Sequence, residues 1–218
     1  MIAVTFALPS ESSDFRRLLG ARHEEVVIFH TGVGGKLCRQ RLEPFLDSQP
    51  CDFLISSGFA GGVDPSLGAG HLFLAENFSD PDLLARARAA LICRVGKLAT
   101  ADRIVENPAE RAQFARQHDA DAVDMETEWI AQACAARKIP MLSLRVISDT
   151  TAAPFPAPPE VLFDLSRQRT NATVLARYLL THPIAIVRLL RFSRQIATVR
   201  RELGLALTTF LLTESETS

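Results

Sequence analysis

Three acidic residues, Glu11, Glu126 and Asp149, each stand shortly after a run of apolar residues that has the character of a β-strand. Ligands of α/β sheets bind beyond the carboxyl ends of the strands. The sequence therefore predicts that the three carboxylates converge at one edge of a sheet. Carboxylates in such a site can take a proton from water, assist a leaving group as general acids or hold hydroxyl groups.

Each of these acids also has an ordinary structural explanation. Glu126 could be a first-turn acid that the helix dipole favours, and Asp149 could be a loop residue that bonds its own backbone. Glu11 could be a solvated surface acid, and Met125 could be core packing. The hypothesis of a shared site depends on all three acids together, because chance is less able to place three acids at three strand ends than to place one acid at one strand end.

Two glycine-rich segments, TGVGG at 31–35 and SGFAGG at 57–62, lie at the same predicted edge of the sheet. A glycine turn before a helix can cradle a phosphate, although it is more often only a tight connection. The residues predicted to face a nucleophile or a phosphate are Thr31, Gly32, Gly34, Phe59, Ala60 and Gly61.

The elements that would position these residues alternate between strand and helix. Strand-like runs are predicted at 2–8, 25–30, 52–57, 71–76, 94–99, 121–124 and 140–148. Helical spacing of apolar residues is found at 35–46, 81–92, 108–118 and 125–138. Near-continuous apolar strands separated by helices predict an α/β fold with helices on both faces of the sheet.

The pattern changes after residue 149. A Pro/Ala-rich loop is followed by a predicted helix at 165–180, then by an amphipathic helix at 184–203 that carries a stripe of arginines. We therefore predict three parts, an α/β domain at 1–180, a C-terminal helical extension at 181–212 and a disordered tail at 213–218.

Composition excludes several classes of protein. Lys plus Arg total 24 and Asp plus Glu total 25, so net charge gives no reason to expect a nucleic-acid partner. The four cysteines and five histidines lack the spacing of metal ligands, and we predict no metal and no cofactor. No targeting peptide and no window of about 18 apolar residues is found, so we expect a cytoplasmic protein.

The segments VDMETEWIA and RVISDT, with TGVGG and SGFAGGV upstream, resemble the purine nucleoside phosphorylase and methylthioadenosine/S-adenosylhomocysteine nucleosidase family over residues 1 to about 150. The C-terminal segment is similar to the tail of the hopanoid-biosynthesis-associated branch, which is thought to release adenine from adenosylhopane. The resemblance implies a three-layer sandwich with a mixed central sheet. It also implies cleavage of the N-glycosidic bond of an adenosine-like nucleoside.

The resemblance also implies roles for individual residues. Glu126 would hold the ribose 2′- and 3′-hydroxyls, and Met125 would pack against the sugar. Asp149 would protonate or hydrogen-bond purine N7, which requires burial or a nearby negative charge, and Arg145 and Ser148 would support it. The purine would lie near Thr100, Asp102 and Ile104.

Glu11 matches the acid that activates water in nucleosidases, whereas phosphorylases carry an arginine there. A carboxylate repels phosphate, so we favour hydrolysis. Phosphorolysis stays an alternative if Arg39, Arg41 or Arg103 reaches the site. A catalytically silent nucleoside-binding module is a second alternative.

Two departures from the family matter. Phe59 replaces a common serine, and the segment at 70–96 is short, which implies a more open pocket for the 5′ group and leaves the family's homodimer open. The amphipathic helix at 184–203 either covers a core or lies on a membrane surface.

Overall fold

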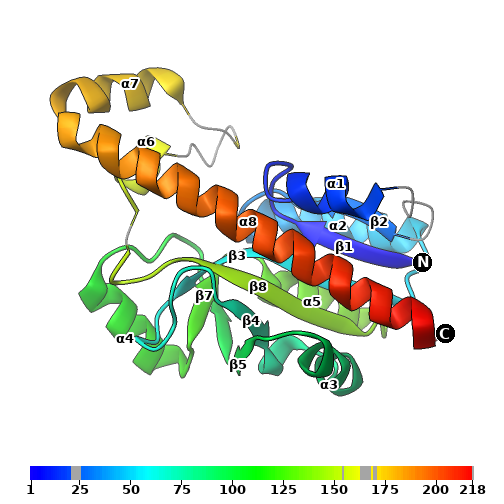
Figure 1. Cartoon of the computed structure of the whole chain (residues 1–218). Helices are drawn as coiled ribbons and strands as arrows, with labels where there is room; N and C mark the ends of the chain where they lie inside the picture. The colour runs from blue at the N-terminus through cyan, green and yellow to red at the C-terminus, as the bar shows by residue number, and fades with distance from the viewer. Residues whose placement is uncertain (21–25, 154, 163–167, 169–170, 218) are drawn as a thin grey trace.

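The structure, a computed structural model of the chain, describes residues 1–20, 26–153, 155–162, 168 and 171–217 (Figure 1). One mixed sheet of eight strands forms its centre, and helices cover both faces, so the predicted three-layer α/β fold is confirmed. The strands are β1 (Ile2–Phe6), β2 (Val26–His30), β3 (Phe53–Gly62), β4 (Leu72–Ala75), β5 (Arg94–Gly96), β6 (Leu98–Thr100), β7 (Ala122–Asp124) and β8 (Met141–Asp149).

The strand order is β2–β1–β3–β8–β4–β5, and β7 pairs with both β3 and β6. Strands β2, β1, β3 and β8 are parallel, whereas β4 runs antiparallel to β8 and β7 runs antiparallel to β3. The carboxyl ends of β1 and β8 thus lie at the same edge, on either side of β3. This topology brings the segments after Phe6 and Ser148 together although they are far apart in sequence.

The helices are α1 (Ser13–Leu19), α2 (Gly35–Ser48), α3 (Pro81–Ala90), α4 (Pro108–His118), α5 (Thr127–Ala136), α6 (Pro159–Leu162), α7 (Ala172–Thr181) and α8 (Pro183–Thr217). Asp80 and Asn107 begin α3 and α4, where each side chain accepts a hydrogen bond from a first-turn N–H group. A proline follows each of these caps and fits the first helical position, whose N–H has no partner within the helix.

The two faces of the sheet bury different cores because neighbouring strand residues point to opposite sides. Ala3, Leu54 and Met141 pack against α2 and α5. The residues that follow them, Val4, Ile55 and Leu142, point to the other face of the sheet, where they pack against α1, α3 and α8.

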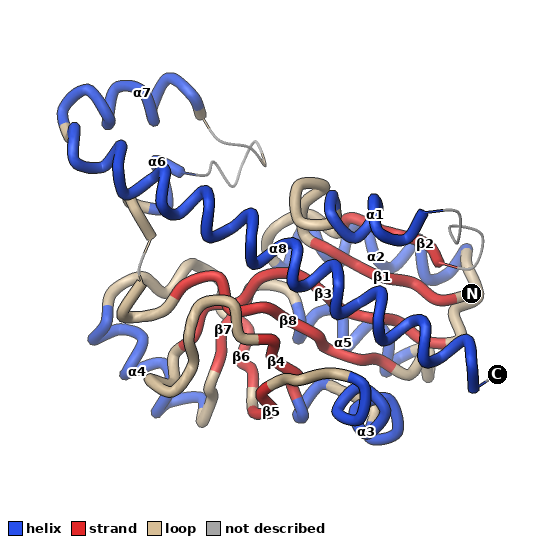
Figure 2. The backbone as a smooth tube through the Cα atoms, in the orientation of Figure 1, coloured by secondary structure: helices blue, strands red, loops and turns tan. Residues whose placement is uncertain are grey.

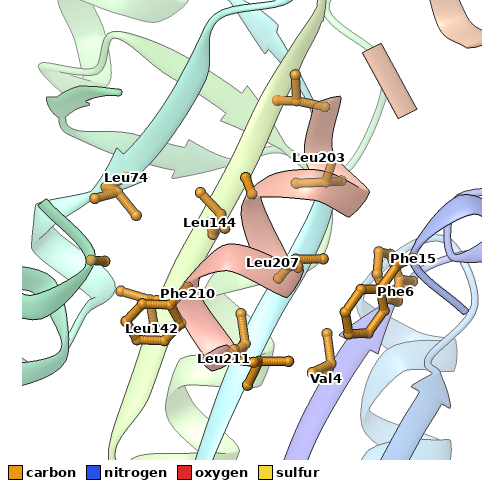
Figure 3. Close-up of a cluster of buried hydrophobic side chains, with 14 of the residues drawn as sticks. Val4, Phe6, Phe15, Leu74, Leu142, Leu144, Leu203, Leu207, Phe210 and Leu211 are labelled. Carbon is orange, nitrogen blue, oxygen red and sulfur yellow. The ribbon is translucent and has the colours of Figure 1, made fainter. Parts of the chain in front are cut away.

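The second half of α8 is part of this second core. Its buried residues Leu203, Leu207 and Phe210 lie across β1 and β8, as Figure 3 shows, and Gly204 lies against the backbone of α1. The structure therefore differs from the predicted division into a domain and an extension at 181–212. Apolar spacing along the helix is regular, but only the residues from Val199 onward pack into this core.

Helix α7 and the first half of α8 project from the sheet (Figure 2). The predicted helix at 165–180 overlaps α7, which begins after Asn171, and residues 165–167, 169 and 170 lie outside the described residues. At the other end, α8 continues to Thr217 where a disordered tail was predicted, and Glu214 pairs with Arg86 at 3.0 Å. No helix in the described part of the chain is long and apolar enough to span a bilayer.

Other elements differ from their predicted bounds. Strand β3 continues through 58–62, where a turn was predicted, because β8 and β7 pair with it there. The predicted strand at 94–99 is two short strands on either side of Lys97. Helix α1 was not predicted, and the first residue of the predicted strand at 25–30 lies outside the described residues.

Candidate active site

Glu11, Glu126 and Asp149 line one cavity of about 310 Å³. Glu11 lies in the turn after β1, Glu126 directly precedes α5, and Asp149 ends β8. The other predicted residues that line this cavity are Phe59, Ala60, Gly61, Ile104, Met125 and Ser148. The arrangement predicted from strand ends is therefore present, with three acids from distant parts of the chain around one space.

Glu11 is held by the backbone of its own turn. Its Oε2 accepts hydrogen bonds from the N–H groups of Ala7 at 3.2 Å and Leu8 at 3.5 Å. Burial raises the pKa of Glu11 to about 7, although Arg145 and the two N–H groups oppose the rise. A carboxyl group with this pKa exchanges protons readily at neutral pH.

The approach of Glu11 to the sheet depends on Gly58 of β3. A Cβ atom at residue 58 would lie 3.1 Å from Glu11 Oε2 and 3.0 Å from Arg145 Nη1. Gly58 also has φ of +142°, a conformation that residues with side chains rarely adopt. The absent side chain leaves room for the carboxylate and the guanidinium group beside the strand.

Glu126 faces the TGVGG segment, and its Oε1 accepts a hydrogen bond of 2.7 Å from the N–H of Gly34. Burial and the neighbouring carboxylate of Asp124 raise the pKa of Glu126 to about 8, against the opposing effect of the Gly34 N–H and Arg145. The protonated form of Glu126 is therefore favoured more than it is in an exposed glutamate.

Asp124 and Arg145 form a buried ion pair of 2.9 Å beneath this side of the cavity. Arg145 also donates to Ser56 Oγ at 2.7 Å and to Thr127 Oγ1 at 2.6 Å. The Thr127 N–H in turn donates to Asp124 Oδ2 at 3.1 Å, which fixes the start of α5 next to Glu126. The sequence analysis assigned a role to Glu126 in the VDMET segment but none to Asp124.

Arg145 was predicted to support Asp149, and the contacts that the structure gives it are instead with Asp124, Ser56 and Thr127. The two residues lie on the same strand four positions apart, a separation of about 13 Å at the rise of a β-strand. Ser148 does support the acid, since its Oγ donates to Asp149 Oδ1 at 2.6 Å.

The partner of Asp149 is Arg111 of α4, which sequence reasoning missed. Arg111 is 1% exposed, and its Nη2 pairs with Asp149 Oδ2. Its remaining donors bind the carbonyl groups of Gly62 at 3.0 Å and Val105 at 3.1 Å. We expected burial or a nearby negative charge to keep Asp149 protonated. The carboxyl group is buried, and the charged group beside it is the Arg111 cation instead of a negative charge.

Thr31, Gly32 and Gly34 do not line the cavity. Two backbone N–H groups of this turn already have acceptors, because Val33 donates to Gln168 Oε1 at 2.7 Å and Gly34 donates to Glu126. Gly34 has a φ of +89°, which residues with side chains rarely adopt. The turn positions an acid here, and these two N–H groups are not open to a phosphate.

The predicted purine residues separate between two cavities. Ile104 lines the cavity of the acids, whereas Arg103 and Val105 line both cavities. Thr100 and Asp102 line a second cavity of about 590 Å³. The Thr100 hydroxyl donates to Asp124 Oδ1 and accepts from the N–H of Glu128, both at 2.9 Å, so it supports Asp124 and the start of α5.

An apolar wall that the sequence did not predict closes the acid-lined cavity on the side of α8. Phe155, from the Pro/Ala-rich loop, packs edge to face against Phe192, with ring centroids 5.6 Å apart. Ile196 lies one turn further along the helix and lines the same cavity. Gln195 fixes α8 to the site by donating to the carbonyl group of Ser148 at 2.8 Å. The cavity thus combines acids with an apolar surface.

The chain matches the phosphorylase superfamily. The family model covers residues 74–181, from β4 through β8 to the end of α7. This match includes Glu126 and Asp149 but not Glu11. The comparisons therefore support the superfamily that the sequence motifs indicated, and they do not extend to the hopanoid-associated branch.

Curated relatives of this superfamily are nucleosidases. The 5′-methylthioadenosine/S-adenosylhomocysteine nucleosidase of Tolumonas auensis is 23% identical over 184 residues, which are 70% of this chain and 80% of the relative. The enzyme of the same name from Geobacillus kaustophilus is 29% identical over 158 residues, which are 57% and 67% of the two chains.

Solved structures of the superfamily share the fold. Futalosine hydrolase of Helicobacter pylori aligns with a TM-score of 0.71 at 15% identity over 96% of both chains. The 5′-methylthioadenosine/S-adenosylhomocysteine nucleosidase of the same organism, solved with butyl-thio-DADMe-Immucillin-A, aligns with a TM-score of 0.72 at 16% identity over 96% and 97%. Together the similarities indicate an N-glycosyl hydrolase of the phosphorylase superfamily.

Proposed function

We propose that this protein hydrolyses the N-glycosidic bond of an adenosine-like nucleoside and releases adenine. The observation that carries the proposal is the single cavity shared by Glu11, Glu126 and Asp149. Its volume of about 310 Å³ lies at the lower end of the range for small-molecule sites. The similarity to nucleosidases supports the same reaction.

Glu11 is the proposed general base. Its pKa of about 7 leaves a large fraction ionised at neutral pH, so the carboxylate can accept a proton from water. The water oxygen forms a bond to C1′ of the ribose as the bond between C1′ and N9 breaks. The electron pair of the broken bond leaves with the purine, which takes up a proton at N7.

Asp149 is the proposed group at N7. In its ion pair with Arg111 it is an acceptor, so it must take up a proton before it can give one to the purine. The base would bind between Asp149 and the side chains of Ile104 and Val105, which line the same cavity. Ser148 keeps the carboxyl group oriented throughout.

Glu126 is the proposed ligand of the ribose hydroxyls, and Met125 is its apolar neighbour at the sugar. The N–H of Gly34 holds one oxygen of Glu126, which leaves the other for the substrate. A carboxylate near the hydroxyls would stabilise the positive charge that develops on the ribose. Because the pKa of free Glu126 is about 8, sugar binding has to promote the loss of its proton.

Phosphorolysis at the same site is the second candidate, and the geometry favours it less. Arg39 lies over the Trp129 ring, 4.2 Å from its centre, and hydrogen-bonds Gln132 instead of entering the site. Arg103 does line the cavity, where it pairs with Glu110. A phosphate dianion in this cavity would therefore meet two arginines, Arg103 and Arg111, which both already pair with acids, and four acids, Glu11, Asp124, Glu126 and Asp149.

The apolar wall of Phe155, Phe192 and Ile196 favours a nucleoside with a bulky apolar group at its 5′ position. Adenosylhopane, which the resemblance of the C-terminal segment implies, is a substrate of this kind, and a role in hopanoid biosynthesis follows from it. A homodimer, a cytoplasmic location and a membrane contact of the C-terminal helix belong to the same proposal.

The test is incubation with adenosine, methylthioadenosine and an adenosyl lipid, with and without phosphate. We expect free adenine in the absence of phosphate, with ribose carrying the water oxygen when the reaction is run in ¹⁸O-water. Release that requires phosphate and yields ribose 1-phosphate would replace hydrolysis by phosphorolysis. Tight adenine binding without product from any substrate would favour the catalytically silent module.

A further inference from the structure

The arm, which we define as α7 and residues 183–191 of α8, carries exposed apolar side chains at its end. Leu180 is 85% exposed, Ile184 is 71% exposed and Leu190 is 57% exposed. Figure 1 shows the arm projecting beyond the sheet, with α7 folded back along the start of α8. Monomeric proteins rarely gather large aliphatic residues on one projecting element without a partner for them.

The charge of the arm has one sign. Between residues 171 and 201 the sequence holds no Asp or Glu, although the whole chain has 25 acids and 24 basic residues. Arg177, Arg188 and Arg191 are exposed, and the described residues provide no ion-pair partner for any of them. Arg194 follows one turn later and is also exposed.

Aliphatic side chains at an exposed tip with arginines beside them are typical of helices that lie in a membrane interface. The aliphatic groups enter the boundary of the acyl chains, and the arginines remain at the level of the head groups. Anionic lipids supply the negative charge that the arm lacks. A neutral protein surface would satisfy the aliphatic groups alone.

The arm is continuous with the cavity of the acids. Phe192 and Ile196 line that cavity from the same helix whose start carries Ile184. Twelve residues separate Ile184 from Ile196, a distance of about 18 Å along a helix. An arm held at a bilayer would therefore keep the apolar wall of the cavity near the lipid surface.

We propose that the arm binds the surface of an anionic bilayer and presents the cavity to nucleosides whose apolar 5′ group is anchored there. The membrane contact stands on the arm alone. The choice of substrate rests on the proposed function.

The test uses full-length variants, because a chain shortened near Tyr178 would lose the core residues of α8 between Val199 and Leu211. Co-sedimentation compares vesicles of phosphatidylcholine with vesicles that also contain phosphatidylglycerol. We expect at least tenfold stronger binding to the anionic vesicles, and a decrease of this binding as salt is added.

Two pairs of substitutions separate the arm from the rest of the surface. Arg188→Gln with Arg191→Gln should lower anionic-vesicle binding about tenfold or more, whereas the matched pair R88Q and R116Q, exposed on α3 and α4, should leave it unchanged. Ile184→Ser with Leu190→Ser should also weaken binding. The matched aliphatic pair is I92S with L205S, at residues that are 100% and 40% exposed outside the arm, and it should leave vesicle binding unchanged.

Absence of binding by the unaltered protein, or equal losses in the arm pairs and their matched pairs, overturns the proposal. A dimer that I184S with L190S dissociates, together with no vesicle binding, would assign the arm to a second copy of the chain. Adenine release from a water-soluble nucleoside without vesicles should be the same in all variants. If no variant released adenine, this would count against the proposed function but would not affect the vesicle-binding result.

Discussion

The two sides of the cavity treat their acids differently. Glu126 is buried and Glu11 is half-buried near Asp124. The nearby cation, Arg145, forms its ion pair with Asp124. Asp149 has a buried arginine of its own. The three carboxyl groups therefore differ in their charged neighbours although all line one cavity, because only Asp149 of the three has its own ion-pair partner.

This difference suits two kinds of work. A group whose pKa lies near neutral pH can exchange a proton with water, as Glu11 would. Asp149, which Arg111 and Ser148 hold in one orientation, would meet the purine in the proposed mechanism. The comparison predicts that substitutions on the two sides differ in their effect on stability and on pH dependence.

Removal of the Arg111 cation should have the largest effect. Arg111→Met leaves the Asp149 carboxylate buried without its partner, and loss of one member of a buried ion pair typically costs about 3–5 kcal/mol. We expect the free energy of unfolding in urea to fall by about this amount. Arg116→Met on the exposed face of the same helix is the matched control and should change it by less than about 0.5 kcal/mol.

The double variant R111M/D149N tests the origin of the loss. If the unpaired charge destabilises R111M, the neutral amide should restore much of its stability, which a double-mutant cycle measures as coupling. Equal free energies of unfolding for the single and the double variant would mean that packing of Arg111, with no contribution from its charge, holds α4 to the sheet.

The sequence could predict the meeting of the acids but not the cation. Parallel strands end at one edge, so Glu11 after β1 and Asp149 at the end of β8 had to approach each other across β3. Arg111 reaches Asp149 from a helix 38 residues earlier, and nothing in PAERAQFARQH distinguishes it from Arg116. Its burial depends on how α4 packs against the sheet, which is a tertiary property.

Two other differences have the same kind of cause. The segment GFAGG has the composition of a turn, yet it is strand because β8 offers it a pairing edge, and tertiary pairing overrides local propensity. Helix α8 has regular apolar spacing along both halves, but only the residues from Val199 onward meet a core. Periodicity predicts an apolar face and cannot state what covers it.

The second prediction concerns turnover. Glu11→Gln and Asp149→Asn should each lower kcat at least about a hundredfold, because each removes a proton acceptor or donor in the proposed mechanism. Glu43→Gln, an exposed acid on α2, is the control and should leave kcat unchanged. Adenine release by purified, folded variants is the measurement, and unchanged rates would contradict the assigned roles.

The residual activity of the variants separates the two sides of the cavity further. A base must be unprotonated to act, so kcat/KM of the unaltered enzyme should rise with pH up to about the pKa of Glu11, which is about 7. This rising limb should disappear in Glu11→Gln and persist in Asp149→Asn. A rising limb in both variants would place the base elsewhere.

The smallest expected effect is a pH dependence of stability that Glu126 produces. Its pKa is about 8 in the folded protein and about 4.5 when exposed, so between these values the folded state binds more protons than the unfolded state. Stability from this group is complete below about pH 4.5 and is lost as pH rises through 8. We expect Tm to fall between about pH 5 and about pH 8.5, and to fall less in Glu126→Gln. Glu128→Gln, two residues further along the chain, is the control and should keep the slope of the unaltered protein. A slope reduced as much in Glu128→Gln as in Glu126→Gln would show that the loss of any nearby acid causes the change. Identical slopes in the unaltered protein and Glu126→Gln would mean that Glu126 is already ionised beside Gly34.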